Sequence, residues 1–325
     1  MTLRVRGNGT ATRRHGSERR PVLLLSAMAS GRWSIPVATT VVLMVALTVA
    51  VVPTGATSPS WIVFSAHPDG AGPQQLYRVA ADGTGLQQIT TGALPAVSPS
   101  VARAGARLVF SRLGSGIFAA NLDGAALRRL TSNARDSFPV FSPDGTRIAF
   151  LRPYRAQWRV YTMSASGASQ RRVPQAPPAG RPSWAPDGKT IVMPAGGDIV
   201  KIDPATGRVL KYYGLTIDPQ IGQTATVSPD GRSLAYVNPR RSTGPPDCGE
   251  GRCPQFGLYL ASIPAPHHPR RIVDDTGAAG WSPDGKSLVF IAKGVLTVRV
   301  VGTGAERTIS TGPHVADGEA PPAWR

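Results

Sequence analysis

The sequence has few of the residues on which most metal and catalytic sites depend. Its 2 cysteines are too few for a disulfide-dense scaffold or a multi-cysteine metal domain. Its 5 histidines form no H-E-x-x-H pattern, and no G-x-S-x-G nucleophile motif occurs. The pair His267-His268 stands in a proline-flanked turn, which favours a solvated loop over a ligand pair. We therefore expect no metal, no cofactor and no enzymatic activity.

Acidic residues are also scarce, with 19 Asp and Glu against 36 Lys and Arg and a net charge of +17. Glycine and proline, by contrast, are frequent, with 36 and 31 residues. Because both residues interrupt helices, this frequency leaves room for few long helices. Hydrophobic residues make up 41% of the chain, which is enough for a packed core and excludes wholesale disorder. The composition predicts an all-β protein rich in turns.

The N-terminal part combines a basic segment with an apolar run. Residues 1–33 contain seven arginines and one glutamate, and no charged residue follows Arg32 until Asp69. Residues 35–52 are apolar except for three threonines and one proline, and a helix of 18 residues would just span a hydrocarbon core of ~30 Å. We expect a basic cytoplasmic segment (1–33), a transmembrane anchor or signal sequence (34–52) and a linker (53–60).

Two interpretations of this apolar run remain open. A cleaved signal could start at Met28 and end near Ala56, whereas an anchor would be retained. The run is longer than the ~7–15 residues usual in a cleaved signal, which favours the anchor. Both interpretations place residues 57–325 outside the cytoplasm, either bound to the cell membrane by a single span or released as a secreted or periplasmic protein. A nucleic-acid partner is therefore not expected.

One short pattern recurs along the rest of the chain. The four clear copies are FSPDGTRIAF (141–150), WAPDGKTIVM (184–193), VSPDGRSLAY (227–236) and WSPDGKSLVF (281–290). A degraded copy, VSPSVARAGARLVF (97–110), precedes them, and its Pro99 aligns with Pro143. WIVF (61–64) matches the end of the pattern, while the C-terminal PPAW matches its beginning. We expect six units, one of them divided between the two ends of the chain.

Each unit is predicted to fold as four strands. The Pro-Asp-Gly triplet favours a tight turn, so the aspartates 144, 187, 230 and 284 are interpreted as turn residues and not as catalytic acids. The apolar triplet that follows indicates a strand buried on both faces. Four strands in about 43 residues, repeated six times, predict a six-bladed β-propeller over residues 61–325.

The repeat P-x-W/F-S-P-D-G-x-x-I-A-F, followed by I-Y-x-x-x-x-D-G and R-R-L-T, resembles the TolB-type propeller repeat. The Gly-His and Trp-Asp dipeptides of the related WD-repeat propellers are absent. The resemblance covers residues 61–325 and implies a propeller in which the last strand completes the first blade. We expect the propeller to be monomeric. It implies no particular partner.

Arginine pairs recur at 128–129, 171–172 and 270–271, in the predicted fourth strands. Their position favours a role in protecting the sheet edges from pairing with other chains. A basic rim that binds anionic polymers remains the alternative interpretation.

The spacing between the last two full copies is longer, and the extra residues fall in NPRRSTGPPDCGEGRCPQ (238–255), between the second and third strands of the fifth blade. An insertion on one face of a repeat protein often marks its binding face. Cys248 and Cys253 are expected to form a disulfide that braces this loop.

We predict a binding platform at the cell envelope for a protein or an envelope polymer, with the membrane as a further partner of the N-terminal helix. The ligand is expected at a mouth formed by the inserted loop and the loops that lead into the first strands of the blades. Two other hypotheses remain open, a polysaccharide lyase or hydrolase and a sensor or accessory module of a membrane-anchored complex. The candidate mouth residues are Arg135, Asp136, Arg181, Gln223, Asp317 and Glu319.

Overall fold

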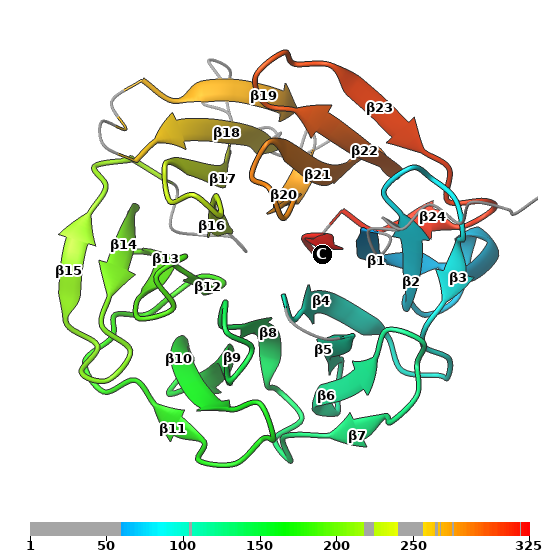
Figure 1. Ribbon diagram of the computed structural model, residues 1–325. Helices are drawn as coiled ribbons and strands as arrows, with labels where there is room; N and C mark the ends of the chain where they lie inside the picture. The colour runs from blue at the N-terminus through cyan, green and yellow to red at the C-terminus, as the bar shows by residue number, and fades with distance from the viewer. Residues whose placement is uncertain are drawn as a thin grey trace, which may run out of the picture. The chain divides into compact units, whose positions relative to one another are not determined.

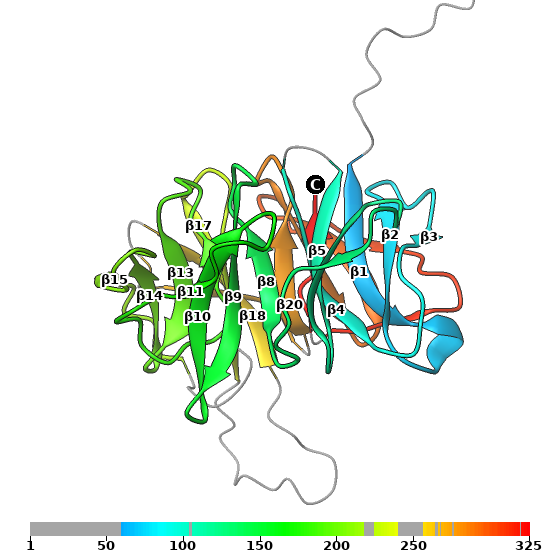
Figure 2. The same cartoon turned by 90° about the horizontal axis from the view of Figure 1, so that it is seen from below.

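The computed structural model describes residues 60–103, 106–217, 224–239, 256–263, 266, 268–274, 276–318 and 320–325. The predicted segments 1–33 and 34–52 lie outside these residues. The described chain forms six antiparallel sheets arranged as blades around a central axis, which Figures 1 and 2 show from two directions. One 3-10 turn, η1 (Pro68–Gly70), occurs among the described residues, and none of their helices is long and apolar enough to cross a membrane. The predicted all-β six-bladed propeller is confirmed.

Blades 2 to 6 each contain four consecutive strands, numbered from the axis outward. Blade 2 contains β4 (Ala96–Val101), β5 (Arg107–Arg112), β6 (Gly116–Asn121) and β7 (Arg128–Arg129). Blade 3 contains β8 (Ser137–Phe141), β9 (Arg147–Tyr154), β10 (Gln157–Ser164) and β11 (Arg171–Arg172). Blade 4 contains β12 (Ser183–Trp184), β13 (Ile191–Ala195), β14 (Asp198–Ile202) and β15 (Val209–Tyr212). Blade 5 contains β16 (Ala225–Val227), β17 (Ser233–Pro239), β18 (Phe256–Ser262) and β19 (Arg270–Asp274), and blade 6 contains β20 (Thr276–Trp281), β21 (Ser287–Ala292), β22 (Val295–Val300) and β23 (Glu306–Ile309).

Blade 1 is assembled from both ends of the propeller. The early strands β1 (Trp61–His67), β2 (Gln75–Ala80) and β3 (Gln87–Gln88) form its outer part. The late strands β24 (Val315–Ala316) and β25 (Ala323–Trp324) both pair antiparallel with β1 and supply its innermost strand. The predicted divided unit is therefore confirmed.

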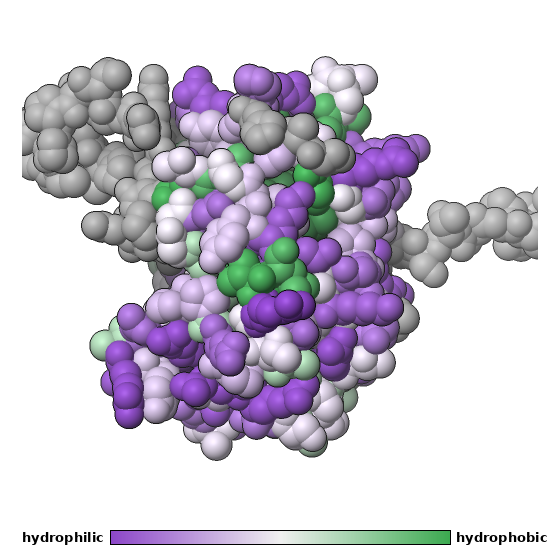
Figure 3. Space-filling view, turned by 90° about the vertical axis from the view of Figure 1, so that its left-hand side faces the viewer, coloured by the Kyte–Doolittle hydropathy of each residue, from purple (hydrophilic) through white to green (hydrophobic). Residues whose placement is uncertain are grey.

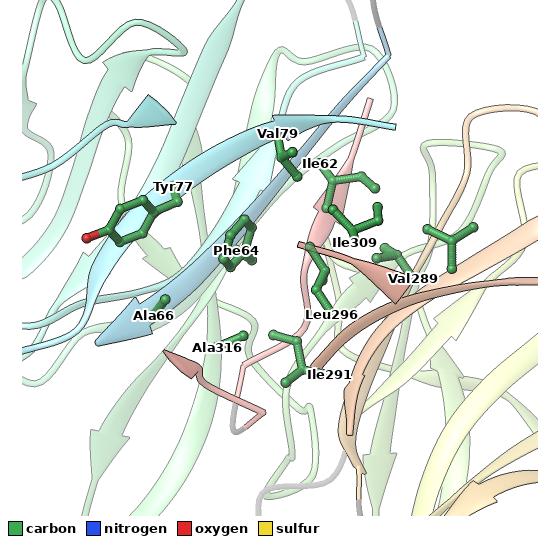
Figure 4. Packing of buried hydrophobic residues seen from close by; sticks show 11 residues of the cluster. Ile62, Phe64, Ala66, Tyr77, Val79, Val289, Ile291, Leu296, Ile309 and Ala316 are labelled. Atoms are coloured by element: carbon green, nitrogen blue, oxygen red, sulfur yellow. The ribbon is translucent and has the colours of Figure 1, made fainter. Parts of the chain in front are cut away.

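The hydrophobic core lies between the blades and not at the axis. The second strands are buried on both faces, as the apolar triplets predicted; Leu108, Val109 and Phe110 of β5, for example, are fully buried. The described residues form six clusters of buried side chains, one for each pair of neighbouring blades. Figure 4 shows the cluster that joins blades 6 and 1, where Val289 and Ile291 of β21 pack with Ile62 and Phe64 of β1 and with Ala316 of β24. Sheet packing of this kind fixes the six first strands around the axis.

The prediction that Pro99 is the turn proline of blade 2 is wrong. Pro99 lies inside β4, and the backbone N–H of Ala102 donates to Arg107 O just as that of Ser142 donates to Arg147 O in blade 3. Pro99 therefore corresponds to Pro139 of β8. In both strands the residue before this proline has a positive φ and lies at a shift of the pairing register. The residue that replaces the turn proline of blade 2 is Arg103.

The inserted residues fall where the spacing predicted, since β17 ends at Pro239 and β18 begins at Phe256. Cys248 and Cys253 lie outside the described residues, and their disulfide stays a prediction.

Candidate functional site

A cavity of ≈ 210 Å³ lies on the axis of the propeller and is lined by the first strands of all six blades. Each of these strands contributes a short, nearly equivalent segment, and the segments are 98–101, 138–143, 181–184, 224–227, 279–281 and 321–324, with Arg103 beside the first. Pairing with the buried second strands holds the segments in place. The propeller fold itself therefore builds this cavity, and we take it as the candidate site.

Small side chains dominate one layer of the lining because six strands converge there. Ser100, Ser183 and Thr226 occupy equivalent positions on three blades, and Gly280 and Ala323 occupy them on two others. A Cβ on Gly280 would lie 2.2 Å from the carbonyl oxygen of Pro322. The close approach of β20 and β25 at this point requires glycine.

The described residues that line the cavity include two cations, Arg103 and Arg181, and no aspartate, glutamate or histidine. Arg103 is accessible, and partial burial lowers the pKa of its guanidinium, since burial disfavours the charged form. Arg181 stacks on an aromatic side chain, with its Cζ 4.2 Å from the ring centroid of Phe138. The lining therefore offers positive charge, serine and threonine hydroxyl groups and aromatic surface.

The structure distributes the predicted mouth residues over different roles. Arg181 lines the cavity, and Arg135 is exposed in the loop before β8. Asp136 is buried, and its two carboxylate oxygens each accept a hydrogen bond of 2.6 Å from Arg152 of β9. This ion pair ties the loop to the second strand of blade 3, so the Asp136 carboxylate is satisfied within the protein.

Asp317 follows β24, and its backbone N–H donates to Ser65 O at 2.8 Å. Gln223 and Glu319 lie outside the described residues, and the structure does not test their predicted role.

The aspartates of the repeated turns act within the turns. Asp144 accepts hydrogen bonds from the Ser142 hydroxyl, at 2.5 Å, and from the backbone N–H and hydroxyl of Thr146. These donors stabilise the carboxylate and lower the pKa of Asp144 to about 2. Asp230 and Asp284 make the equivalent bonds to the serine two residues earlier. Their structural interpretation is supported by this geometry.

Arginine contacts also connect successive blades. Arg107 and Arg147 follow the turns of blades 2 and 3, and each donates to the carbonyl of the turn glycine in the next blade, Gly145 or Gly188. Their guanidinium groups also lie over Phe141 and Trp184, respectively. These bonds position the turns beside the cavity.

The arginine pairs lie on the outermost strands β7, β11 and β19, as predicted. Arg128 of β7 donates to Ser166 O and Ala165 O of the next blade. Blade 4 differs, because its outer strand β15 carries the exposed Leu210 and Tyr212. Figure 3 views the ring from the side on which blade 4 lies and shows a mostly hydrophilic surface with small hydrophobic patches. Both interpretations of the arginine pairs remain compatible with these positions.

Among the residues that the structure describes, no group of three or more His, Cys, Asp or Glu side chains is placed to hold a metal ion. His267 lies outside those residues, and His268 is exposed. His314 directly precedes β24 of blade 1, where its ring contacts Tyr77 and its Nδ1 accepts a hydrogen bond from the Asp69 backbone N–H.

Sequence reasoning missed Arg103 as a site residue. The signal was present, because SPSVARAGARLVF aligns without a gap with FPVFSPDGTRIAF. That alignment places Ala-Arg-Ala-Gly opposite Ser-Pro-Asp-Gly and Pro99 opposite Pro139. Matching the dipeptide Ser98-Pro99 to Ser142-Pro143 placed Pro99 at the turn instead.

Comparison with known proteins agrees with this architecture. Residues 44–186 match the family model described as the TolB beta propeller domain, whereas no curated protein matches the sequence significantly. TolB from Acinetobacter baumannii is similar with a TM-score of 0.64 and 18% identity, over 83% of this chain and 67% of that one. A candidate TolB from Agrobacterium tumefaciens is similar with a TM-score of 0.57 and 16% identity, over 82% of this chain and 94% of that one. Hydrazine synthase from Kuenenia stuttgartiensis is similar with a TM-score of 0.51 and 16% identity, over 70% of each chain.

The chain is a six-bladed β-propeller, and residues 44–186 are similar to the TolB beta propeller domain. At these identities the structural similarity shows the fold alone. Because one of the similar structures is an enzyme, the fold does not decide between binding and catalysis.

Proposed function

We propose that this protein is a non-catalytic binding platform at the cell envelope, which holds a protein or a smaller ligand at the mouth of its central cavity. The observation that carries the proposal is the chemistry of the cavity. Its described lining combines cations, hydroxyl groups and aromatic rings, which suit recognition, and it contains no carboxylate or imidazole to act as a general acid or base.

Hydrolysis of a polysaccharide would ordinarily require two carboxyl groups across the scissile bond. The carboxylates described near the cavity are committed to other bonds, with Asp136 paired to Arg152 and Asp144 held in its turn. This arrangement favours binding over hydrolysis.

The cellular location belongs to the same proposal. Residues 34–52 are proposed to direct the propeller out of the cytoplasm, either as a retained anchor or as a cleaved signal, on the strength of the arginine-rich segment before them. A reporter enzyme fused after residue 325 should be active only when it lies outside the cytoplasm. Cytoplasmic activity of the reporter would contradict the proposal, and an intact N-terminus in the mature protein would identify an anchor.

Filling the cavity tests the binding role. Ser183 lines the cavity from β12, so Ser183→Trp should obstruct it, whereas Ser166→Trp places the same bulk in an exposed turn. After cross-linking in intact cells, molecules bound by the wild type should be depleted from Ser183→Trp and retained by Ser166→Trp. Equal recovery from the two variants, with equal unfolding temperatures, would contradict binding at this cavity.

A further inference from the structure

Blade 2 differs from blades 3 to 6 at the turn between its first two strands. Those four blades place Pro-Asp-Gly there, with a carboxylate in each turn, whereas blade 2 has a turn that begins Ala102-Arg103. The exchange removes a negative charge from the rim of the cavity and adds a positive one. Arg103 makes no hydrogen bond or ion pair with any described residue, although the corresponding turns are closed by internal bonds.

A second polar group on the same strand also lacks a partner. Ser98 of β4 lines the cavity, its side chain is buried, and its hydroxyl group makes no hydrogen bond. A buried hydroxyl group without a partner is unfavourable unless a ligand completes it, whereas Arg103 is an accessible cation that a ligand can reach. Ser98 and Arg103 lie toward the two ends of the lining that blade 2 contributes, and a ligand that accepts hydrogen bonds and carries negative charge suits each of them.

The rest of the lining agrees with such a ligand. Arg181 adds a second cation, and its stacking on Phe138 restricts the orientation of its guanidinium. The described lining residues include no carboxylate. A volume of ≈ 210 Å³ equals that of about seven water molecules in the liquid, which fits a compact anion and not a folded domain.

We infer that the central cavity binds a compact oxyanion, a carboxylate or a phosphate group, with Arg103 as its principal counter-charge. The inference rests on the proposed function, because it names the chemistry that the same cavity recognises. The planar guanidinium suits both groups, since each presents two oxygens to its paired N–H donors. The anion is either a free small molecule or the charged group of a larger partner, and the shared chemistry is the oxyanion.

The test titrates the full-length protein, purified in a mild detergent, with citrate, with inorganic phosphate and with sodium chloride at matched ionic strength. Binding is followed by calorimetry and by the unfolding temperature. Citrate or phosphate should stabilise the wild type more than chloride does, and the stronger of the two identifies the oxyanion. Equal effects of all three salts would overturn the inference.

Substitutions of Arg103 test whether the oxyanion binds at this position. Arg103→Gln should weaken binding by about 10- to 100-fold, the range expected for loss of a charged hydrogen bond. Arg103→Lys should be intermediate, because it keeps the charge and loses the paired donors. Arg171→Gln, an exposed arginine on the outer strand β11, is the matched control and should bind as the wild type does. If Arg103→Gln and Arg171→Gln lose the same amount of oxyanion affinity, the loss reflects the overall charge of the protein, and the proposed site is refuted.

This test fails independently of the proposed function. If no oxyanion binds while Ser183→Trp still loses its cross-linked molecules, the platform stands and the anion site does not. If the oxyanion binds through Arg103 while Ser183→Trp retains those molecules, the anion site stands and the platform does not.

Discussion

Blade 1 and blade 3 use the same four-stranded arrangement but hold their first strands differently. In blade 3 a turn of five residues joins β8 to β9, and Asp144 closes it with bonds to Ser142 and Thr146. In blade 1 the first strand arrives from the other end of the chain, and Arg325 exchanges two backbone hydrogen bonds of 2.9 Å with Trp61. Local turns cost little loop entropy, whereas the closing pair joins residues from opposite ends of the propeller and closes a much longer loop. The closing blade should therefore be the most sensitive point of the propeller.

The largest expected effect comes from removing the closing strand. Deletion of residues 319–325 removes β25 and uncovers β1, so the free energy of unfolding should fall by more than the ~3–5 kcal/mol typical of losing one large buried side chain. Urea unfolding measures this loss. Deletion of Arg325 alone, which removes its two backbone bonds to Trp61 and the bond that the Ser60 hydroxyl donates to its carbonyl, should cost about 1–3 kcal/mol. Equal stabilities of the wild type and the longer deletion would show that the blade does not need closure.

Two tryptophans at equivalent positions of the first strands allow the closing blade to be compared with a continuous blade. Trp184 of blade 4 is 5% exposed, lies under the guanidinium of Arg147 and donates to Val140 O, so Trp184→Ala should cost ~3–5 kcal/mol. Trp324 occupies the equivalent register opposite Ile62 but is only partly buried, and its indole donates to the Ser60 hydroxyl. Trp324→Ala should therefore cost less than Trp184→Ala in the same urea experiment. The reverse order would contradict the exposure difference as its cause.

A smaller effect is expected at the contact between blades 6 and 1. Gly280→Ala would drive a methyl group into the Pro322 carbonyl and should cost about 1–3 kcal/mol, as overpacking does. Gly302→Ala is the matched control, because its Cβ would meet no atom within 4 Å. Thermal unfolding compares the two. Equal unfolding temperatures would mean that β20 and β25 separate easily.

The smallest effect concerns acid. The pKa of Asp144 is lowered from 3.8 to about 2 in the folded protein, so its ionised form stabilises the turn above about pH 4 and that contribution disappears as the pH falls through 2. Asp144→Asn removes the titration, so its stability should decline less steeply between pH 4 and pH 2. The readout is the urea midpoint at each pH. Identical slopes for the two proteins would contradict the role of the turn carboxylate.

The repeat predicted most of the fold because it encodes local structure. Pro-Asp-Gly specifies a turn, and the apolar triplets specify strands buried on both faces, such as 148–150 in β9. Pro99 misled the alignment because a proline preceded by a positive φ also occurs inside a first strand, as Pro139 does after Phe138. Dipeptide matching does not distinguish a turn proline from a strand proline, whereas strand pairing does.

The candidate site was less predictable because it depends on side chains brought together from separate blades. Arg181 was identified from its position before a first strand, and it lines the cavity. Asp136 was chosen by the same reasoning, yet it is paired with Arg152, a residue sixteen positions later whose partner the sequence does not reveal. Charge and loop position alone do not separate a ligand-binding side chain from one that holds a loop in place.

The hydrogen bond between the Ser60 hydroxyl and the Arg325 carbonyl, at 2.6 Å, brings the two ends of the propeller to one point. Because the two ends meet, the chain termini could be moved to another loop without changing how the blades pack. A circular permutant that links residue 325 to residue 60 and opens at the exposed turn around Thr303 should form the same six blades. In that permutant blade 6 would become the divided blade, and blade 1 would become continuous.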